Sequence, residues 1–596
     1  MLKLLTRFSK KEWLLILVAV AFIAVGVWLD LLLPEFTGKI ANAITPDRLA
    51  GGIITGEMAD IWINGAWMLA CTVGSVVTVV IVSYITARVS ASYSARVRSE
   101  IFEKVNSFGT EEMKKFSVAS LITRSTNDVT HIRMFIAMGM QMLIKAPITA
   151  VWGVIKIWGK SVEMSIVTGI VAGVMIIVIV FLMFLVLPKF KKIQILTDKV
   201  NQVARENLTG IRVVRAYNAE QHEQEKFEGA NEDLTANNLF TSRAMGFMMP
   251  FMSLLMSGLG LAVWWMSAHL FNIGTLDKDG IGIVIEAQQY AFQIIFAFIM
   301  VIMIFIIMPR VMISARRIME VLKVAPSIVD PAHSPETHFD EKEPTEQGEI
   351  EFNNVAFKYP DAEEYVLRDI NVKIAPGTTV AFIGSTGSGK STLVNLLPRL
   401  YDATEGEILL DGRNVRDMTL EQLHDKVGYI PQTAVVFKGT IKSNIAFGTI
   451  GEHEISDEQV TRALEIAQAS EFVSKMQGGI DAEVSQGGKN LSGGQKQRLA
   501  IARVVARRPR VFIFDDTFSA LDYKTDKALR ESLKKECAGS TVLIVAQRIG
   551  TIMNADNIVV LDEGRIVGQG THKELLKSCE VYREIAYSQL SKEELK

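Results

Sequence analysis

Residues 384–391 read GSTGSGKS and directly follow the apolar run TVAFI at 379–383. This order fits the phosphate-binding pattern G-x-x-x-x-G-K-[ST], in which a buried strand leads through a glycine-rich loop into a helix. The glycines let backbone N–H groups point at phosphate oxygens, Lys390 can reach the β- and γ-phosphates, and the Ser391 hydroxyl can bind Mg²⁺. The predicted nucleotide-binding residues here are Gly384, Ser385, Thr386, Gly387, Ser388, Gly389, Lys390, Ser391 and Thr392.

A second short apolar run, VFIF at 511–514, ends in Asp515. Such a run is typical of a buried strand in a parallel sheet, and a carboxylate at its end is well placed to hold Mg²⁺. The pentapeptide LSGGQ at 491–495 lies shortly before this strand. On its own, such a pentapeptide also fits an ordinary glycine-rich turn.

Together, these three segments resemble the ATP-binding cassette (ABC) family, whose signature is similar to LSGGQ. The resemblance implies an α/β P-loop domain that binds ATP and Mg²⁺, with the metal held by Ser391, Gln432 and Asp515. It also implies that Tyr359 stacks on adenine, although an aromatic residue beside a proline more often packs in a core or loop. The remaining family positions are Asp522, which ends the D-loop SALD, and the signature residues Leu491, Ser492, Gly493, Gly494 and Gln495.

Both positions that the family uses for hydrolysis are altered in this chain. The family usually has Glu after the Asp of the strand, where it orients the attacking water, and this chain has Asp516. The shorter side chain sets the carboxylate back, and a misplacement of about 1 Å can lower a rate on the order of a hundredfold. The family then places a His after the strand 541–546, whereas this chain has Gln547, whose amide can donate a hydrogen bond but carries no charge. Either change alone is compatible with drift, but both together predict a site that binds ATP and hydrolyses it slowly.

An intact signature beside an altered hydrolytic site points to a partner. In the family two cassettes close head to tail, so that each ATP lies between the phosphate loop of one and the signature of the other. The signature of this chain would therefore serve the ATP of its partner. The asymmetry resembles that of heterodimeric bacterial multidrug exporters, and it implies a partner half with the usual Glu and His. The resemblance covers essentially the whole chain.

The first half of the chain is strongly apolar. The whole sequence is 49% hydrophobic with a mean hydropathy of +0.25, which is too apolar for a cassette joined to a typical soluble domain. Six stretches before residue 310 are each about long enough to cross a bilayer as a helix. They run roughly from 14 to 33, 61 to 86, 132 to 155, 164 to 187, 247 to 271 and 286 to 308.

Basic residues predict the orientation of these spans. Lys10 and Lys11 precede the first span and Arg316 and Arg317 follow the sixth, whereas the loop near 272–282 has one Lys and two Asp. The positive-inside rule makes the basic side cytoplasmic. We therefore expect a multi-pass protein of the cell (cytoplasmic) membrane with both termini and the nucleotide domain in the cytoplasm.

Other sequence features narrow the class of protein. The first apolar run exceeds a signal-peptide core and no small-residue cleavage site follows before Pro34, so we expect it to be retained. The sequence has three cysteines, Cys71, Cys537 and Cys579, and their spacing is not that of metal ligands. We therefore expect no disulfide framework and no metal cluster. The net charge of −2 does not indicate the basic surface that nucleic-acid binding requires.

The sequence predicts an all-α six-helix transmembrane domain fused to the α/β domain. The predicted parts are a transmembrane domain at 1–317, a linker rich in proline and acid at 318–348, and a nucleotide-binding domain at 349–596. The polar segments 88–131 and 189–245 are expected to extend the spanning helices into the cytoplasm. By resemblance each carries a coupling helix, with candidates at 107–115 and 210–217, although ordinary amphipathic helix surface is the alternative.

Polar residues at membrane depth are the candidates for substrate contact. Asp30, Glu286 and Gln289 lie in or at the edge of spans, and an acid on the transport path would favour cationic cargo. The alternative is that Glu286 and Gln289 lie at the outer interface, Lys145 snorkels or pairs, and only Asp30 is deep.

These observations favour an ABC-type ATPase coupled to transport, forming one half of an exporter of multidrug or lipophilic compounds. Its own site, with Asp516, Gln547 and Gln432, is expected to be degenerate, and its signature to complete the site of a heterodimeric partner. An ATP-gated membrane regulator that exports nothing, and a homodimer that exports lipid or peptide, remain the alternatives.

Overall fold

Long helices fill the first half of the chain and sheets with short helices fill the second. The computed structural model describes residues 7–44, 58–160, 162–273, 280–331, 348–448 and 454–590. The chain forms two compact units. The first contains Met1–Asn106 and Val118–Lys323, and the second contains Ser107–Ser117 and Val324–Lys596.

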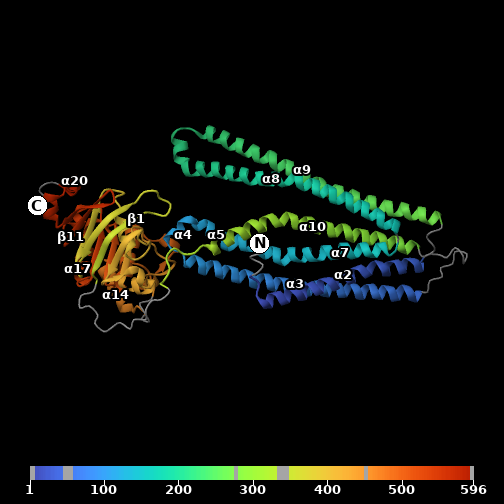
Figure 1. Ribbon diagram of the computed structural model, residues 1–596, viewed down its shortest axis with the longest axis horizontal. Helices are drawn as coiled ribbons and strands as arrows, with labels where there is room; N and C mark the ends of the chain where they lie inside the picture. The colour runs from blue at the N-terminus through green and yellow to red at the C-terminus, as the bar shows by residue number, and fades with distance from the viewer. Residues whose placement is uncertain are drawn as a thin grey trace. The chain divides into compact units, whose positions relative to one another are not determined.

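Among the described residues, six helical segments of the first unit are long and apolar enough to cross a membrane, which confirms the six expected spans. They are α2 Lys10–Ile44, α3 Met58–Asn106, the segment Val118–Trp158, α8 Val162–Ala216, α9 Glu220–Asn272 and α10 Gly280–Lys323. Helix α2 packs along α3, α8 packs along α9, and α10 packs along α7 Met140–Trp158 (Figure 1). Large apolar side chains such as Phe184 are exposed on these helices, as expected where helices face lipid.

The third span is not a uniform α-helix. It consists of α5 Val118–Thr123, α6 Val129–Met134 and α7, joined by the π-helical turns η1 Arg124–Asp128 and η2 Phe135–Gly139. Turns of this kind interrupt the ordinary helical repeat and are frequent at functional sites. In η1 the buried Asp128 accepts a hydrogen bond of 2.8 Å from Ser314 of α10, which ties the third span to the sixth.

The second unit is built on a six-stranded sheet with the strand order β12-β11-β3-β10-β9-β6. Its central strands β3 Thr379–Gly384, β10 Thr541–Val545 and β9 Val511–Asp515 pair in parallel. Their side chains are almost all buried, which explains why the sequence shows continuous apolar runs there rather than an alternating pattern. The other strands of this sheet are β6 Val427–Ile430, β11 Asn557–Asp562 and β12 Arg565–Gly570.

Smaller sheets and helices complete this unit and confirm the predicted α/β fold. A four-stranded antiparallel sheet has the order β2-β1-β4-β5. Its strands are β1 Ile350–Phe357, β2 Leu367–Ile374, β4 Glu405–Leu410 and β5 Arg413–Asn414, and β7 Gly439–Thr440 pairs with β8 Glu483–Val484. The helices are α11 Lys390–Leu396, α12 Leu420–Lys426, α13 Ile441–Ile445, α14 Asp457–Ile466, α15 Ser470–Ser474, α16 Gly493–Arg507, α17 Tyr523–Glu536, α18 Ile549–Ile552, α19 His572–Ser578 and α20 Glu580–Gln589.

The two coupling-helix candidates differ in structure. The first contains the short helix α4 Thr110–Lys115, which belongs to the second unit. Glu112 of α4 accepts hydrogen bonds from the backbone N–H groups of Gly109, at 2.8 Å, and Ser327, at 2.9 Å. The second candidate, 210–217, is not a separate helix, because α8 continues to Ala216 and a tight turn leads directly into α9.

The expected linker begins as helix, since α10 continues to Lys323. The part of it at 332–347, the loop residues 274–279 and the first six residues lie outside the described residues. The domain limits expected at 317 and 348 stay predictions.

Candidate nucleotide site

The phosphate-binding loop leaves β3 at Gly384 and enters α11 at Lys390. Gly384 has a φ of 157°, and a Cβ atom there would lie 2.0 Å from the carbonyl oxygen of Leu561, so a side chain does not fit. The Lys390 ammonium donates to the carbonyl oxygens of Gly384, at 2.9 Å, and Ser385, at 2.7 Å. The lysine thus lies along the same loop whose backbone is predicted to surround phosphate.

The carboxylate at the end of β9 lies beside the start of α11. Asp515 is buried and accepts hydrogen bonds from the hydroxyls of Ser391, at 2.6 Å, and Tyr429, at 3.2 Å. Burial raises the pKa of Asp515, although these hydrogen bonds and Lys390 oppose the shift. Burial also lowers the pKa of Lys390. Because burial disfavours both charged forms, a ligand that brings a cation to the carboxylate and phosphates to the ammonium would stabilise them.

The residues expected to act in hydrolysis lie together. Asp516 has a φ of 48°, in the left-handed region that Asp tolerates better than most residues. Its Oδ2 atom accepts a hydrogen bond from the Nε2 atom of Gln432, at 3.0 Å, and another from the Nε2 atom of Gln547, also at 3.0 Å. The side-chain amides of Gln432 and Gln547, which are far apart in the sequence, therefore donate to the same carboxylate oxygen. Their part in hydrolysis stays a prediction.

Two residues that contact this site, Gln589 and Tyr429, were not predicted from the sequence. Gln589, at the end of α20, donates to the carbonyl oxygen of Gln547 at 2.7 Å and accepts from the N–H group of Ile549 at 2.8 Å. The C-terminal helix therefore holds the segment that carries Gln547. Tyr429, which donates to Asp515, was missed as well. No local pattern marks either residue, because each contact joins positions distant in the chain.

Tyr359 lies in an aromatic cluster beside the phosphate-binding helix. Its ring makes edge contacts with Phe357 and Tyr401, at centroid distances of 5.0 and 5.3 Å, and its hydroxyl lies 3.0 Å from Oγ1 of Thr392. The Nζ atom of Lys114, on α4, lies 4.5 Å from the centroid of the Tyr359 ring, within cation–π range. These contacts fix the ring next to α11, and its stacking on adenine stays a prediction.

The LSGGQ segment forms the start of α16. Ser492 and Gln495 make a capping box, in which Ser492 Oγ accepts from the N–H group of Gln495 at 3.3 Å and Gln495 Oε1 accepts from the N–H group of Ser492 at 2.8 Å. Leu491 is buried, whereas Ser492 and Gly493 are exposed. The helix N-terminus therefore presents its backbone donors outward, as an anion-binding end requires. Asp522 of the D-loop caps α17 through the N–H group of Thr525, at 2.9 Å.

Both halves of the chain match models of one family. Residues 15–310 match the ABC transporter transmembrane region, and residues 367–519 match the ABC transporter family. The chain belongs to the ABC transporter family. It is 36% identical over 540 residues to an uncharacterized ABC transporter ATP-binding protein of Mycobacterium tuberculosis, covering 90% of this transporter and 91% of that protein.

Other relatives also cover most of the transporter. An uncharacterized ABC transporter ATP-binding protein of Bacillus subtilis is 34% identical over 579 residues, covering 95% of this chain and 96% of its own length. An ATP-dependent lipid A-core flippase of Syntrophus aciditrophicus is 31% identical over 504 residues, covering 83% of this chain and 80% of its own length. The structure of a bacterial Atm1-family ABC exporter with ATP bound superposes with a TM-score of 0.78 at 22% identity, covering 96% of this chain and 98% of that one. The transporter thus has the fused membrane and ATP-binding regions of its family and the fold of an ABC exporter.

Acid–lysine pairs occur among the spanning helices of the transporter. Asp30 of α2 accepts from Lys145 of α7 at 3.0 Å and from the hydroxyl of Ser75 at 2.5 Å. Glu286 of α10 is buried and lies 3.0 Å from Lys160. Both acids are therefore neutralised by lysine, and the pairing alternative for Lys145 is the one that the structure shows. The part of Asp30, Glu286 and Gln289 in substrate contact stays a prediction.

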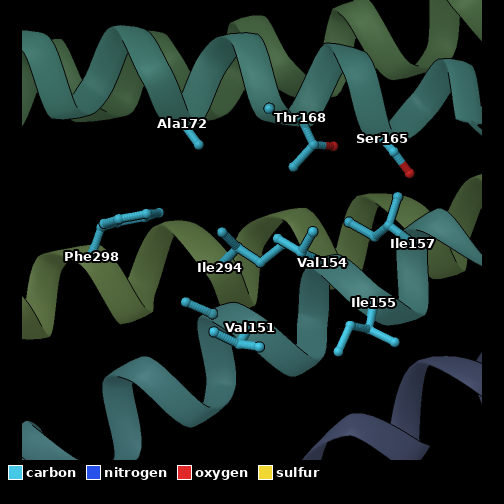
Figure 2. Close-up of a pocket in the computed structure, with 11 residues that line it drawn as sticks. Val151, Val154, Ile155, Ile157, Ser165, Thr168, Ala172, Ile294 and Phe298 are labelled. Atoms are coloured by element: carbon cyan, nitrogen blue, oxygen red, sulfur yellow. The ribbon is translucent and has the colours of Figure 1, made fainter.

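Two further features lie in the same helices. Glu35 of α2 pairs with Lys156 of α7, and Gln289 is half-buried on α10. Between α7, α8 and α10 lies an almost wholly apolar cavity of about 380 Å³. Figure 2 shows Phe298 and Ile294 of α10 on one side of this cavity and Thr168 of α8 on the other.

Proposed function

We propose that the chain is one half of an ATP-driven exporter of lipophilic compounds, and that it binds ATP in a site that hydrolyses slowly. The observation that carries this proposal is the Asp516 carboxylate with two glutamine amides, Gln432 and Gln547, on the same oxygen. The proposal places the transporter in the cytoplasmic membrane, with the nucleotide-binding unit in the cytoplasm.

The chemistry of these three side chains favours binding over hydrolysis. A water held for attack on the γ-phosphate needs a carboxylate in line with it and a group that stabilises the developing charge. Asp516 is one methylene shorter than Glu, and Oδ2 already accepts two hydrogen bonds. Gln547 donates through a neutral amide, which cannot become a cation as an imidazole can. The phosphate loop and Asp515 carry none of these changes, so ATP binding is retained.

The donor set at the loop fits Mg²⁺. The Ser391 hydroxyl and the Asp515 carboxylate are hard oxygen ligands whose oxygens lie 2.6 Å apart, and Mg²⁺ prefers oxygen ligands together with phosphates and water. Gln432, whose Nε2 atom faces Asp516, would complete the set through its amide oxygen. When bound, the metal neutralises charge on the phosphates.

The exposed signature supports a two-chain arrangement. Ser492 and Gly493 lie at an outward-facing helix N-terminus, where they can bind the phosphates of an ATP held by a second half-transporter. We infer that the second half carries the competent hydrolytic residues. ATP binding then brings the cassettes together, the coupling segments reorient the spans, and hydrolysis at the competent site resets the pair.

The test starts from the tagged chain purified from its native host. Co-purifying proteins are identified by mass spectrometry, and the ATPase activity of the complex is measured with Lys390→Ala in this chain or the same change in the partner. We expect an unequal ABC half-transporter and activity that survives Lys390→Ala here but not in the partner. A homodimer with ordinary turnover would refute the degenerate site.

Lipid export is the second candidate function, and the similarity to a protein named as a lipid A-core flippase favours it. Vectorial transport into inside-out vesicles separates both candidates from an ATP-gated regulator, because a regulator would hydrolyse ATP and move no solute.

A further inference from the structure

A second cavity in the first unit has a chemically mixed wall. It measures about 400 Å³ and lies between α3, the third span and α10. The residues on which the argument depends are Thr86, Met138, Gln141, Met142, Lys145 and Met300. All of them belong to helical segments that are long and apolar enough to cross a membrane. We call it the Lys145 cavity.

The polar part of the wall is ordered by hydrogen bonds. Gln141 donates through its Nε2 atom to Oγ1 of Thr86, at 2.7 Å, and to the carbonyl oxygen of Ala137, at 3.0 Å. Ala137 lies in the π-helical turn η2, directly before α7. This turn shifts the angular positions of the following residues around the helix, and the cavity is lined by residues of both η2 and α7.

Lys145 brings a cationic group to the cavity wall. Lys145 lines the cavity, whereas its counter-ion Asp30 does not. Asp30 keeps a second donor, the Ser75 hydroxyl at 2.5 Å, so the carboxylate remains hydrogen-bonded if the lysine turns to another anion. An ammonium has three donors, and about a third of the Lys145 side chain is exposed.

The apolar part of the wall suits a variable hydrocarbon. Met138, Met142 and Met300 are flexible thioethers that adapt to irregular apolar shapes. Further along α7 lies the cavity of Figure 2, lined by Val151, Val154 and other apolar residues. One helix thus carries a cationic group and, after it, apolar cavity walls.

We propose that the Lys145 cavity binds the acidic head group, a carboxylate or phosphate, of an amphiphilic substrate, with Lys145 as the residue that selects the anion. This proposal rests on the proposed export function and specifies its substrate class. The chain supplies a matched control for it, because Lys156 also lies on α7 and pairs with an acid of α2, Glu35, but lines none of the described cavities.

The test uses the complete transporter with its partner in nanodiscs of neutral lipid and in inside-out vesicles. A fluorescent dodecanoate, its methyl ester and the corresponding alkylammonium are compared for binding and for ATP-dependent uptake. We expect the dodecanoate to bind best and Lys145→Met to weaken its binding about tenfold or more, since hydrogen bonds to charged groups contribute about 1.5–3 kcal/mol. The ester should be unaffected, and Lys156→Met should behave as wild type.

Asp30→Asn distinguishes anion selection from a structural role of the ion pair. It leaves Lys145 without its counter-ion, so the affinity for dodecanoate should rise, whereas a purely structural pair would make both substitutions lose binding. Lys145→Arg should retain the preference for the anion. Displacement of the probe by phosphatidate would identify a membrane lipid as the source of the head group, and displacement by single-chain acids alone would identify a free amphiphile.

The failures of the two proposals are distinguishable. Equal binding of acid and ester, or equal losses in Lys145→Met and Lys156→Met, would overturn the head-group assignment even if the ester is exported. Lys145-dependent binding of the acid, with no ATP-dependent uptake of any probe, would uphold the site and overturn the exporter.

Discussion

At the scale of single residues, the proposed slow hydrolysis depends on the length of the Asp516 side chain and on the neutral amide of Gln547, which donates to it. Asp516→Glu together with Gln547→His should raise ATP hydrolysis at this site on the order of a hundredfold, because the longer carboxylate reaches the attacking water and an imidazole can carry charge. The measurement is the ATPase rate of the complex with the partner's phosphate-loop lysine changed to Ala. Adding Lys390→Ala should remove the gain, and an unchanged rate in the double variant would contradict the proposed cause.

The loop glycines allow a second residue-scale prediction, on stability. Gly384 and Gly387 both have positive φ, at 157° and 89°, but only at Gly384 would a Cβ meet a backbone atom, the Leu561 carbonyl oxygen at 2.0 Å. Gly387→Ala should cost about 1–3 kcal/mol in the free energy of unfolding, the usual cost of such a backbone conformation. Gly384→Ala should cost more, because β3 or β11 must also move, and should abolish ATP binding. Thermal unfolding with and without MgATP measures both, and equal effects would refute the steric argument.

At the scale of elements, α4 is fixed to its unit by one buried carboxylate. Burial alone would raise the pKa of Glu112, but hydrogen bonds from Ser327 and Gly109 outweigh it and lower the pKa below 4.5. A lowered pKa means that the contribution to stability is present above about pH 4.5 and is lost as the pH falls through the folded-state value. Glu112→Ala should therefore cost about 1–3 kcal/mol near neutral pH and reduce the acid sensitivity of unfolding.

The neighbouring Glu111 provides the control for this prediction. It pairs with Lys115 on the surface of the same helix, where such pairs contribute little. Chemical denaturation from pH 3 to 7 should show a clear loss for Glu112→Ala and almost none for Glu111→Ala. Substrate stimulation of the ATPase should also fall in the first variant, if α4 couples transport to ATP binding.

How much of the molecule the sequence predicts depends on the range of the interactions. The six spans and the buried parallel strands follow from local patterns, because hydropathy and buried apolar runs can be seen among near neighbours in the chain. The second coupling candidate, at 210–217, is not a separate short helix, because α8 continues to Ala216. The contacts of Tyr429 and Gln589 and the pairing of Asp30 with Lys145 are set by tertiary packing, which one sequence does not display.

At the scale of the whole molecule, the proposed inequality of the two ATP sites can be tested by substitutions in this chain alone. Gly494 belongs to the signature that would contact the ATP of the partner, and Lys390 belongs to the site for which we propose slow hydrolysis. Gly494→Asp places a carboxylate at a helix N-terminus that should bind phosphate, so it should lower the ATPase rate of the complex about a hundredfold, as the loss of an oxyanion donor does. Lys390→Ala should lower that rate by only about twofold, because a site that hydrolyses slowly adds little to the total. Photolabelling with an ATP analogue should show the reverse, with Lys390→Ala removing label from this chain and Gly494→Asp sparing it. If both substitutions abolished turnover equally, the two sites would be equivalent and the asymmetry attributed to Asp516 and Gln547 would have no consequence for the transport cycle.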